Sequence, residues 1–250
     1  MYTISSASAA VTGARHLRAG RNGQDAAAVW VGADCGVAVV CDGCSSGAFS
    51  EVGARLGSQL AMRVIREELV LQPPREIWAA VRGRLVAELE GITDSIGGDR
   101  ERGDRERILH DHFLFTIIAA AWRGDEVAVW ALGDGGYALG DRVIELGPFA
   151  NNQPPYLAYD LLGELQPAHL EIADARCGGV TVATDGVVEV GLGGIVEPKH
   201  FDHPDALRRK LAVLARSSER IDWRDQRVVR SRASLQDDGA VAALAWRVVS

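Results

Sequence analysis

The sequence has few features of a membrane, secreted or nucleic-acid-binding protein. No apolar run in its 250 residues approaches bilayer-spanning length, and residues 1–11 lack a basic stretch followed by a long apolar run. Four cysteines are too few for a disulfide scaffold in a chain of this size. The net charge is −7 without a dominant basic stretch, which argues against a nucleic-acid partner. We therefore expect a cytoplasmic monomer that binds neither membrane nor nucleic acid.

Apolar residues are plentiful and form a pattern typical of one mixed domain. They make up 47% of the chain, enough for a sizeable core, and no linker divides residues 1–250, which we expect to form a single domain. Residues 1–12 are rich in Ser and Ala and are predicted to be flexible. Residues 98–107 are the pentapeptide Gly-Asp-Arg-Glu-Arg repeated twice, and this repeat has no apolar residue to bury. Residues 91–112 are therefore predicted to be a charged surface loop.

Alternating strand and helix patterns predict an α+β fold. Two amphipathic helices are expected early in the chain, one beginning near Ser50 and one after Pro73-Pro74. Their buried stripes are predicted to be Val52, Leu56, Leu60 and Val64 in the first helix, and Ile77, Val81, Leu85 and Leu89 in the second. A third helix is expected over 204–220. Strands are predicted at 29–31, 37–41, 113–122, 126–132, 137–139, 143–146, 180–183 and 241–249.

Four of these apolar strands meet an Asp next to a glycine or a second Asp. The four motifs are Asp42-Gly43, Gly133-Asp134-Gly135, Asp185-Gly186 and Asp237-Asp238-Gly239. Each one alone fits an ordinary Asp-Gly turn. Together they place several carboxylates at the ends of buried strands, where they would repel one another unless a cation lay between them. Carboxylate, carbonyl and water oxygens are the ligands of Mg²⁺ or Mn²⁺, so the sequence predicts such a site.

The ordered set of motifs resembles the metal-dependent 2C-type Ser/Thr protein phosphatases. Ser50-Glu-Val-Gly-Ala54 is similar to a bacterial branch of that family. The matching segments are Asn22-Gly-Gln-Asp25-Ala26, Asp42-Gly43, Leu132-Gly-Asp134-Gly135, Ala183-Thr-Asp185-Gly186 and Asp237-Asp238-Gly-Ala-Val241. The resemblance implies a central antiparallel β-sandwich flanked by helix layers, in four layers αββα. It also implies a phosphorylated protein as substrate.

The resemblance further assigns roles to individual residues. It implies that two Mn²⁺ or Mg²⁺ ions are bridged by Asp42, with Gly43 offering a carbonyl to one of them. Asp185 and Asp237 would complete the other ion's ligands, and catalysis would depend on these two and Asp42. The remaining implied metal residues are Asp25, beside or just behind the ligands, and Asp134, for a weaker third ion.

Some positions depart from the family pattern. Gln24 stands where many members have an acidic ligand, and Gly20 stands where the family often has a phosphate-binding Arg. Arg18 or Arg21 is predicted to take over that role, since a guanidinium fits phosphate in a bidentate manner. Cys44 occupies a position where some members carry a His that can act as a general acid.

Three further features have competing interpretations. Cys41-Asp-Gly-Cys44 has the spacing of a redox or zinc motif, but the sequence contains no second C-x-x-C, and an end of a buried strand is the favoured interpretation of Cys41. His110-Asp-His112 offers a metal pair or simply ends the charged loop. Residues 147–166 are rich in Pro and Asn and are predicted to be an ordered loop, either a substrate-selecting flap or a plain connector.

The sequence therefore supports one leading function and two alternatives. The leading function is hydrolysis of phosphoserine or phosphothreonine in proteins by a metal-activated water. The first alternative is a degenerate, non-catalytic module that binds a phosphorylated partner, motivated by Gln24 and the missing Arg. The second is a hydrolase of small phosphoesters, which metal chemistry alone does not distinguish from the first.

Overall fold

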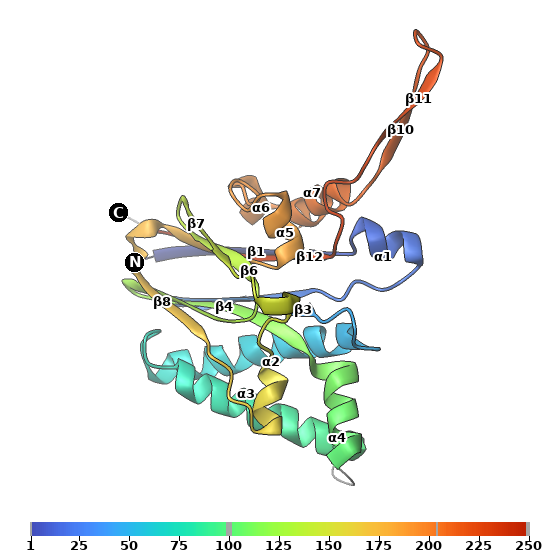
Figure 1. Ribbon diagram of the computed structural model, residues 1–250. Helices are drawn as coiled ribbons and strands as arrows, with labels where there is room; N and C mark the ends of the chain where they lie inside the picture. The colour runs from blue at the N-terminus through green and yellow to red at the C-terminus, as the bar shows by residue number, and fades with distance from the viewer. Residues whose placement is uncertain (1, 99–101, 204, 249–250) are drawn as a thin grey trace.

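Two antiparallel sheets stacked face to face form the centre of the molecule (Figure 1). This computed structural model describes residues 2–98, 102–203 and 205–248. One sheet has the strand order β1 (Tyr2–Val11), β12 (Gly239–Val248), β9 (Gly179–Ala183), β6 (Gly135–Leu139), β7 (Arg142–Leu146). The other has the order β2 (Ala26–Val31), β3 (Cys35–Gly43), β4 (Phe115–Arg123), β5 (Glu126–Leu132), β8 (His169–Asp174).

Helices cover the outer face of each sheet. The second sheet packs against α2 (Ser50–Leu71), with α3 (Trp78–Thr93) beside it. The first sheet is covered by α5 (Asp185–Val190), α6 (Lys199–Asp202) and α7 (Ala206–Leu214). The short helix α1 (Ala14–Ala19) lies at one end of the sandwich. The predicted αββα architecture is confirmed.

Strand β3 shows why the sequence of a central strand is a continuous run of apolar residues. Its alternate residues Ala38 and Val40 join the core between the sheets, while Val37, Val39 and Cys41 join the core under the helices. Side chains alternate across a strand, and here both faces are covered, so every position is apolar. The strand can therefore end deep in the protein, at Asp42.

The buried stripe predicted for the first helix is confirmed only in part. In α2, Val64 is fully buried and Leu56 and Leu60 are half-buried against the core, but Val52 is 50% exposed. The helix instead packs through small residues: a Cβ at Gly57 would lie 2.3 Å from the Phe115 ring. Close approach of the backbone to β4 selects the glycine and alanine face over the bulkier one. The stripe predicted for the second helix is buried in full, at Ile77 and along α3.

The predicted flexible segment at residues 1–12 was also wrong. Residues 2–11 form β1, which pairs antiparallel with β12 from Tyr2 opposite Val248 to Val11 opposite Gly239. Its alternation of Ser and Ala is a strand pattern, and Ala7 and Ala9 are buried in the core beneath α7. The alanine side chains are small, but their regular placement lets a helix pack closely over them.

The predicted charged loop at 91–112 is helical where it is described. After α3 come the π-helical turn Asp94–Gly98, α4 (Arg102–Ile108) and a second π-helical turn, Leu109–Phe113. Arg105 joins this segment to α3 by ion pairs with Glu90 at 3.0 Å and Asp94 at 2.8 Å. The charges thus pair along helix faces, which the sequence reading missed; residues 99–101 of the predicted loop lie outside the described residues.

Two segments between strands have more structure than expected. Residues 147–166 contain the 3₁₀ turns η3 (Ala150–Asn152) and η4 (Leu157–Leu162), and Asp160 fixes η4 to α3 by two hydrogen bonds from Arg82, at 2.7 and 2.8 Å. The helix expected over 204–220 ends at Leu214, and a hairpin of β10 (Ser218–Asp222) and β11 (Arg227–Ser231) follows. In Figure 1 this hairpin projects away from the body of the molecule.

No helix in the described part of the chain has the length and apolar character needed to cross a membrane.

Candidate metal centre

The strand ends named above converge on one acidic cavity. Asp42 lies at the end of β3, Asp134 between β5 and β6, and Asp185 at the start of α5 directly after β9. Asp237 precedes β12 and Asp25 precedes β2. The cavity has a volume of about 150 Å³ and is bordered by all six predicted metal residues, Asp25, Asp42, Gly43, Asp134, Asp185 and Asp237.

A buried hydroxyl fixes Asp25 at the wall of this cavity. Thr184 Oγ1 donates a hydrogen bond to Asp25 Oδ2 at 2.6 Å and accepts one from Ala240 N at 2.9 Å. Burial raises the pKa of Asp25 well above its ordinary value; the Thr184 hydrogen bond opposes this shift, and the negative charge of Asp238 adds to it. The hydrogen bond from Thr184 therefore fixes the position of Asp25, while burial makes the ionised form of its carboxyl group less favourable.

The neighbouring carboxyl groups are destabilised by one another as well as by burial. Burial first, and then the charges of Asp25 and Asp185, raise the pKa of Asp42 well above its ordinary value. Burial and the charge of Asp185 raise the pKa of Asp134 to about 6. Among the described residues lining this cavity, none is Lys or Arg. The site thus concentrates negative charge without a protein cation, which is the condition a bound metal ion relieves.

The ligand chemistry fits hard divalent cations. The cavity offers carboxylate oxygens from five predicted ligands and a backbone carbonyl at Gly43, while His, and any second Cys beside Cys44, are absent from its described lining. Oxygen donors of this kind suit Mg²⁺ and Mn²⁺, and zinc would favour His and Cys. The donor set present therefore fits the metals expected from the sequence.

Asp238 is a site residue whose role the sequence reading did not find. Only 3% of it is exposed, and it accepts hydrogen bonds from Gly13 N at 2.7 Å and Gln24 N at 2.6 Å. His16 Nδ1 lies 2.7 Å from Asp238 Oδ2, the same oxygen that accepts from Gln24 N, while Gly13 N donates to Oδ1. These partners join the segments before α1 and β2 to the start of β12. The pair Asp237-Asp238 was a visible sequence signal for a second carboxylate at this position, but nothing in the sequence indicated that Asp238 would contact His16.

His16, Asp237 and Asp238 form a compact group of possible ligands. One ligand atom from each lies within 4.8 Å of the others. Both oxygens of Asp238 already accept hydrogen bonds from the protein, so this carboxylate is best placed to orient its neighbours. Asp237 keeps 45% of its side chain exposed and faces the cavity.

Neither predicted phosphate-binding arginine lines the cavity. Arg18 is exposed, and its Nη2 lies 3.4 Å from Gln236 Oε1; Arg21 is exposed as well. The arginine that contacts a predicted ligand is Arg15, whose Nη1 lies 3.4 Å from Asp237 Oδ2. A phosphate-binding role for Arg18 or Arg21 stays a prediction, and the structure adds Arg15 to the candidates.

Gln24 faces the start of α2 as well as the cavity. Its Nε2 donates a hydrogen bond to Ser50 Oγ at 2.6 Å, and its backbone carbonyl accepts one from Gly43 N at 3.2 Å. A Cβ at Gly43 would lie 2.9 Å from both Gln24 O and Ser50 O, so the turn after β3 needs glycine for close packing. Gln24 therefore joins β2, β3 and α2 beside the site.

The loop over 147–166 reaches the cavity. Pro154 and Tyr156 line it, next to Cys44. Burial raises the pKa of Tyr156 far above its ordinary value, with hydrogen bonding to Cys44 next in size, so its hydroxyl stays protonated. Burial opposes ionisation of Cys44, but hydrogen bonds with Ser46 and Tyr156 outweigh it and lower the pKa of the thiol. The loop is thus placed where a flap would need to be.

The competing motifs have structural explanations. Cys41 is fully buried in β3 and both Cys41 and Cys44 are free thiols. His112 Nδ1 lies 3.3 Å from Ile108 O, and its ring stacks on Phe49 with centroids 5.1 Å apart. His110 contacts its neighbour Asp111 at 3.3 Å. These contacts favour packing and turn roles over metal binding.

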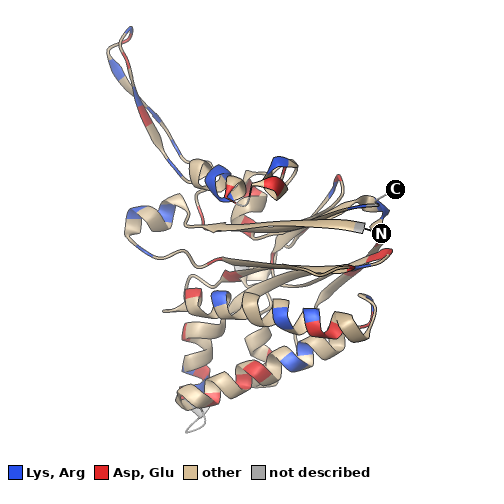
Figure 2. Ribbon diagram, turned by 180° about the vertical axis from the view of Figure 1, so that it is seen from behind, with Lys and Arg blue, Asp and Glu red and all other residues tan. Residues whose placement is uncertain are grey.

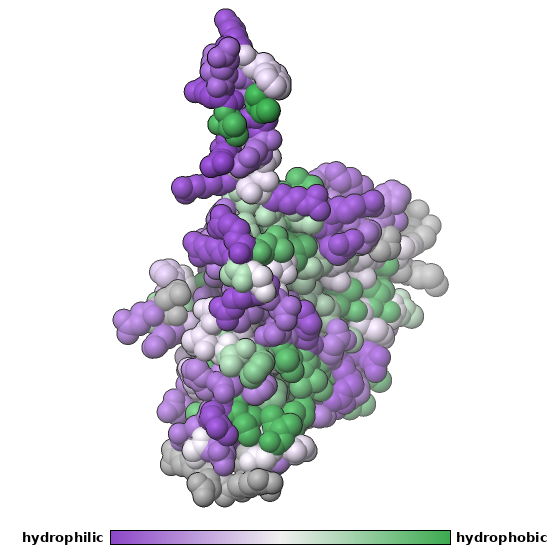
Figure 3. All heavy atoms as spheres, turned by 90° about the vertical axis from the view of Figure 1, so that its right-hand side faces the viewer, coloured by the Kyte–Doolittle hydropathy of each residue, from purple (hydrophilic) through white to green (hydrophobic). Residues whose placement is uncertain are grey.

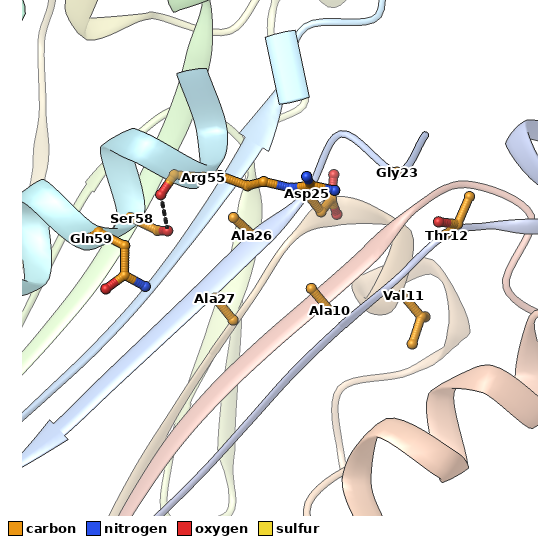
Figure 4. A pocket seen from close by; sticks show the side chains of 10 residues that line it. All are labelled: Ala10, Val11, Thr12, Gly23, Asp25, Ala26, Ala27, Arg55, Ser58 and Gln59. Atoms are coloured by element: carbon orange, nitrogen blue, oxygen red, sulfur yellow. Dashed lines mark hydrogen bonds between the residues drawn. The ribbon is translucent and has the colours of Figure 1, made fainter. Parts of the chain in front are cut away.

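A second cavity lies on the other side of Asp25 (Figure 4). It has a volume of about 290 Å³ and is walled by small residues of β1 and β2, such as Ala10 and Ala27, and by α2. The Arg55 side chain extends from α2 toward Asp25 (Figure 4). Asp25 therefore borders both cavities and is the single carboxylate among the described residues that line the second one.

The chain belongs to the protein phosphatase 2C family, whose model matches residues 12–230. Several solved structures share its fold. The catalytic domain of the serine/threonine protein phosphatase PstP, in complex with two manganese ions, has a TM-score of 0.60 at 17% identity, covering 99% of this chain and 100% of that one. PppA of Pseudomonas aeruginosa has a TM-score of 0.61 at 17% identity, with 98% of each chain covered.

A third example is Stp1 from Staphylococcus aureus, a serine/threonine phosphatase. Its TM-score is 0.57 at 14% identity, and the match covers 99% of this chain and 96% of that one. No curated protein matches the chain by sequence. At identities of 14–17%, the structural similarity shows only that the fold is shared. The family assignment rests on the match of residues 12–230 to the family model.

Proposed function

We propose that this protein is a Mn²⁺- or Mg²⁺-dependent phosphatase that hydrolyses phosphoserine or phosphothreonine in proteins. The observation that carries the proposal is the convergence of Asp25, Asp42, Asp134, Asp185 and Asp237 on one cavity without a protein cation in its described lining. Membership of the protein phosphatase 2C family supports the reaction class. We further propose a single phosphatase domain acting as a cytoplasmic monomer.

The metal ions would be held by oxygen donors of four segments. Asp42, Asp185 and Asp237 would hold them through carboxylate oxygens and Gly43 through its backbone carbonyl. Asp134 would serve a third, weaker ion. When bound, such ions lower the pKa of water and neutralise charge on the phosphoryl group.

The chain's own residues have three tasks around this reaction. Thr184 Oγ1 donates a hydrogen bond to the Asp25 carboxylate and the Asp238 backbone N–H donates one to Asp237 Oδ1 at 3.0 Å, which keeps these oxygens oriented before substrate arrives. Arg15, at the rim beside Asp237, is positioned to pair with a phosphate oxygen. Tyr156 and Pro154 wall the cavity on the side of the 147–166 loop, where they would contact a bound substrate.

The test compares Asn variants of the ligands with a matched surface variant. Asp42→Asn and Asp185→Asn are expected to lower kcat on a phosphothreonine peptide by about 10²-fold or more, the size of a lost electrostatic stabiliser. Asp141→Asn, at an exposed turn, should keep activity. Circular dichroism would show that all three are folded. Full activity in either cavity variant would contradict the proposal.

A non-catalytic phosphoprotein-binding module remains the second candidate. It is favoured by two observations, the absence of Arg from the described cavity lining and the use of the Gln24 amide in a hydrogen bond to Ser50. This candidate predicts tight binding of a phosphopeptide without release of phosphate. Metal-dependent turnover by the purified chain would exclude it, and comparison of kcat/KM on peptides and small esters would separate protein substrates from small ones.

A further inference from the structure

The hairpin formed by β10 and β11 stands apart from both sheets. It is a two-stranded sheet of its own, with Ser218 opposite Ser231 at its base and Asp222 opposite Arg227 near its tip. Neither strand pairs with any other described strand. It projects well beyond the rest of the molecule in Figures 1 and 3. A hairpin with no layer over either face is marginally stable in water, which indicates a role in contacting another molecule.

The base of the hairpin adjoins the acidic cavity. Residues 232–236 lead from β11 directly to the proposed ligand Asp237. Within this short connection, Leu235 is fully buried and accepts a hydrogen bond from Ala14 N at 3.2 Å through its carbonyl. The hairpin therefore rises from a fixed point at the rim of the site, on the same end of the sandwich as α1 (Figure 1).

The hairpin is basic in a chain that is acidic overall. Between residues 216 and 232 there are six arginines and three acidic residues, whereas the whole chain carries −7. Figure 2 shows the basic residues distributed along its length. Arg230 pairs with Glu219 at 2.8 Å and Arg227 with Asp225 at 3.2 Å. Arg220 and Arg224 have no ion pair with any described residue, so their guanidinium groups are available to a partner.

Apolar side chains are exposed next to these arginines. Ile221 and Val228 lie directly opposite each other in the register, on the same face, and are 54% and 55% exposed. Trp223, near the tip, is 79% exposed. Figure 3 shows such apolar atoms among the hydrophilic surface of the hairpin. An exposed Trp beside free arginines is the composition that anchors protein partners.

We propose that the β10–β11 hairpin is a docking arm that binds an extended acidic segment of the phosphoprotein substrate. The segment adds as a strand to an open edge of the hairpin, its carboxylates pair with Arg220 and Arg224, and its apolar residues cover Ile221 and Val228. The proposal rests on the proposed function. Docking at the rim raises the local concentration of the attached phosphorylated residue at the cavity.

The charge pattern selects this partner over a second copy of the hairpin. Two hairpins paired edge to edge would bring unpaired arginines together, and like charges on an edge strand oppose such pairing. An acidic strand relieves the same charges. The overall negative charge of the chain would in addition repel a long polyanion such as duplex DNA from the rest of the surface.

The test measures docking without catalysis. The probe is a fluorescein-labelled, unphosphorylated peptide of alternating Glu and Val, titrated with the full chain in chelator and followed by anisotropy; a Lys-Val peptide is the charge control. The variants are Arg220→Glu with Arg224→Glu, Trp223→Ser, and replacement of residues 218–231 by Asn-Gly, which suits the closely spaced strand ends. Arg209→Glu with Arg247→Glu, both exposed and outside the hairpin, is the control of equal charge.

We expect the charge reversal of Arg220 and Arg224, and the replacement of residues 218–231, to weaken binding of the Glu-Val peptide by about tenfold or more. Trp223→Ser should weaken it by several-fold. The control pair should bind within about twofold of the unaltered chain, because salt-screened distant charges contribute little. Hydrolysis of a small phosphoester should be unchanged in all hairpin variants, while kcat/KM on a phosphothreonine peptide extended by the Glu-Val segment should fall in parallel with binding.

Four results would overturn the docking arm. They are undetectable peptide binding by the unaltered chain, equal binding by the hairpin variants, hairpin-dependent binding of duplex DNA or anionic vesicles that exceeds peptide binding, and a hairpin-dependent dimer that excludes the peptide. Because the titration needs neither metal nor turnover, its outcome is independent of whether the chain proves to be a phosphatase.

Discussion

The two ends of the sandwich are built on opposite principles. At one end Trp122 of β4 and Trp246 of β12 stack with centroids 5.2 Å apart, and Trp246 Nε1 donates to Ala175 O at 2.6 Å. At the other end the same pair of sheets brings Asp25 and Asp42 into a cavity where burial and mutual repulsion disfavour their ionised forms. One end stabilises the fold, and the other reduces its stability in order to form a site.

This contrast explains how one set of strands can both stabilise the fold and form an acidic site. Apolar burial along the strands and aromatic stacking at one end contribute stability without any ligand. The carboxylate end gains its full stability only when a cation enters. We therefore expect removal of a stacked ring and neutralisation of a crowded carboxylate to change the stability of the metal-free protein in opposite directions.

Removing a stacked ring should produce the largest loss. Trp122→Ala deletes a fully buried side chain and leaves a cavity beside Trp246, for which we expect a loss of about 3–5 kcal/mol in the free energy of unfolding. Urea denaturation would measure it, with the exposed Trp223→Ala as the matched control, expected to change stability by less than about 0.5 kcal/mol. A loss below about 1 kcal/mol at Trp122 would show that the aromatic end is not a main source of stability.

At the acidic end, loss of a hydrogen-bond partner should also destabilise. His16→Ala removes one of the three groups that contact the buried Asp238 carboxylate. We expect a loss of about 1.5–3 kcal/mol, the range for a hydrogen bond to a charged group, since Gln24 N still donates to the same oxygen of Asp238. The exposed His203→Ala is the control. If both substitutions changed stability equally, Asp238 would not be the anchor described above.

Neutralising a crowded carboxylate should have the opposite sign. Asp42→Asn removes a charge that burial and two neighbouring Asp residues disfavour, so the metal-free variant should be more stable than the unaltered protein by about 1 kcal/mol. Saturating Mn²⁺ should reverse the order, because the variant loses a ligand. Thermal unfolding with and without Mn²⁺ measures both effects, and a metal-free variant with lowered Tm would contradict the account.

The pH dependence of the metal-free protein should reflect the same crowding. The pKa of Asp134 is raised from 3.8 to about 6 in the folded state, so the folded protein binds this proton more tightly than the unfolded chain. Its contribution to stability is present below about pH 4 and is lost as the pH rises through about 6. Denaturation at pH 5 and 7.5 should show the decline, and Asp134→Asn should show a shallower one. An equal or steeper decline in stability in the variant would show that Asp134 is not the source of this pH dependence.

Much of the fold was predictable because the apolar pattern is regular. The strands of both hairpins around Asp42 and Asp134, and the stripe of α3, follow directly from their alternation or helical repeat. The first turns of the buried face of α2 were not predictable from hydrophobicity, since Gly53, Ala54 and Gly57 are buried there because the helix lies close to β4. Likewise β1 alternates Ser and Ala, and only its pairing with β12 distinguishes it from a flexible end.

The site was predictable as a set of residues and not as a set of contacts. Asp42, Asp134, Asp185 and Asp237 each stand beside a glycine or a second Asp next to an apolar strand, which is a local signal, whereas Asp25 was implied only by the resemblance. The contacts of Asp238 with Gly13 and His16 join positions more than two hundred residues apart, and nothing local encodes them. Arg18 and Arg21 were chosen by their place in the sequence, whereas the fold brings Arg15 nearest to Asp237.

The most direct test of the central claim is a Mn²⁺ titration followed by two readouts on the same samples. One is release of phosphate from a phosphothreonine peptide, and the other is the rise in Tm. The account predicts that both increase over the same range of Mn²⁺ concentration, that chelator abolishes both, and that Asp42→Asn loses phosphate release and most of the rise in Tm. Metal-independent turnover, or no turnover from folded protein whose Tm rises with Mn²⁺, would contradict the claim that this cavity is a metal-dependent phosphatase site.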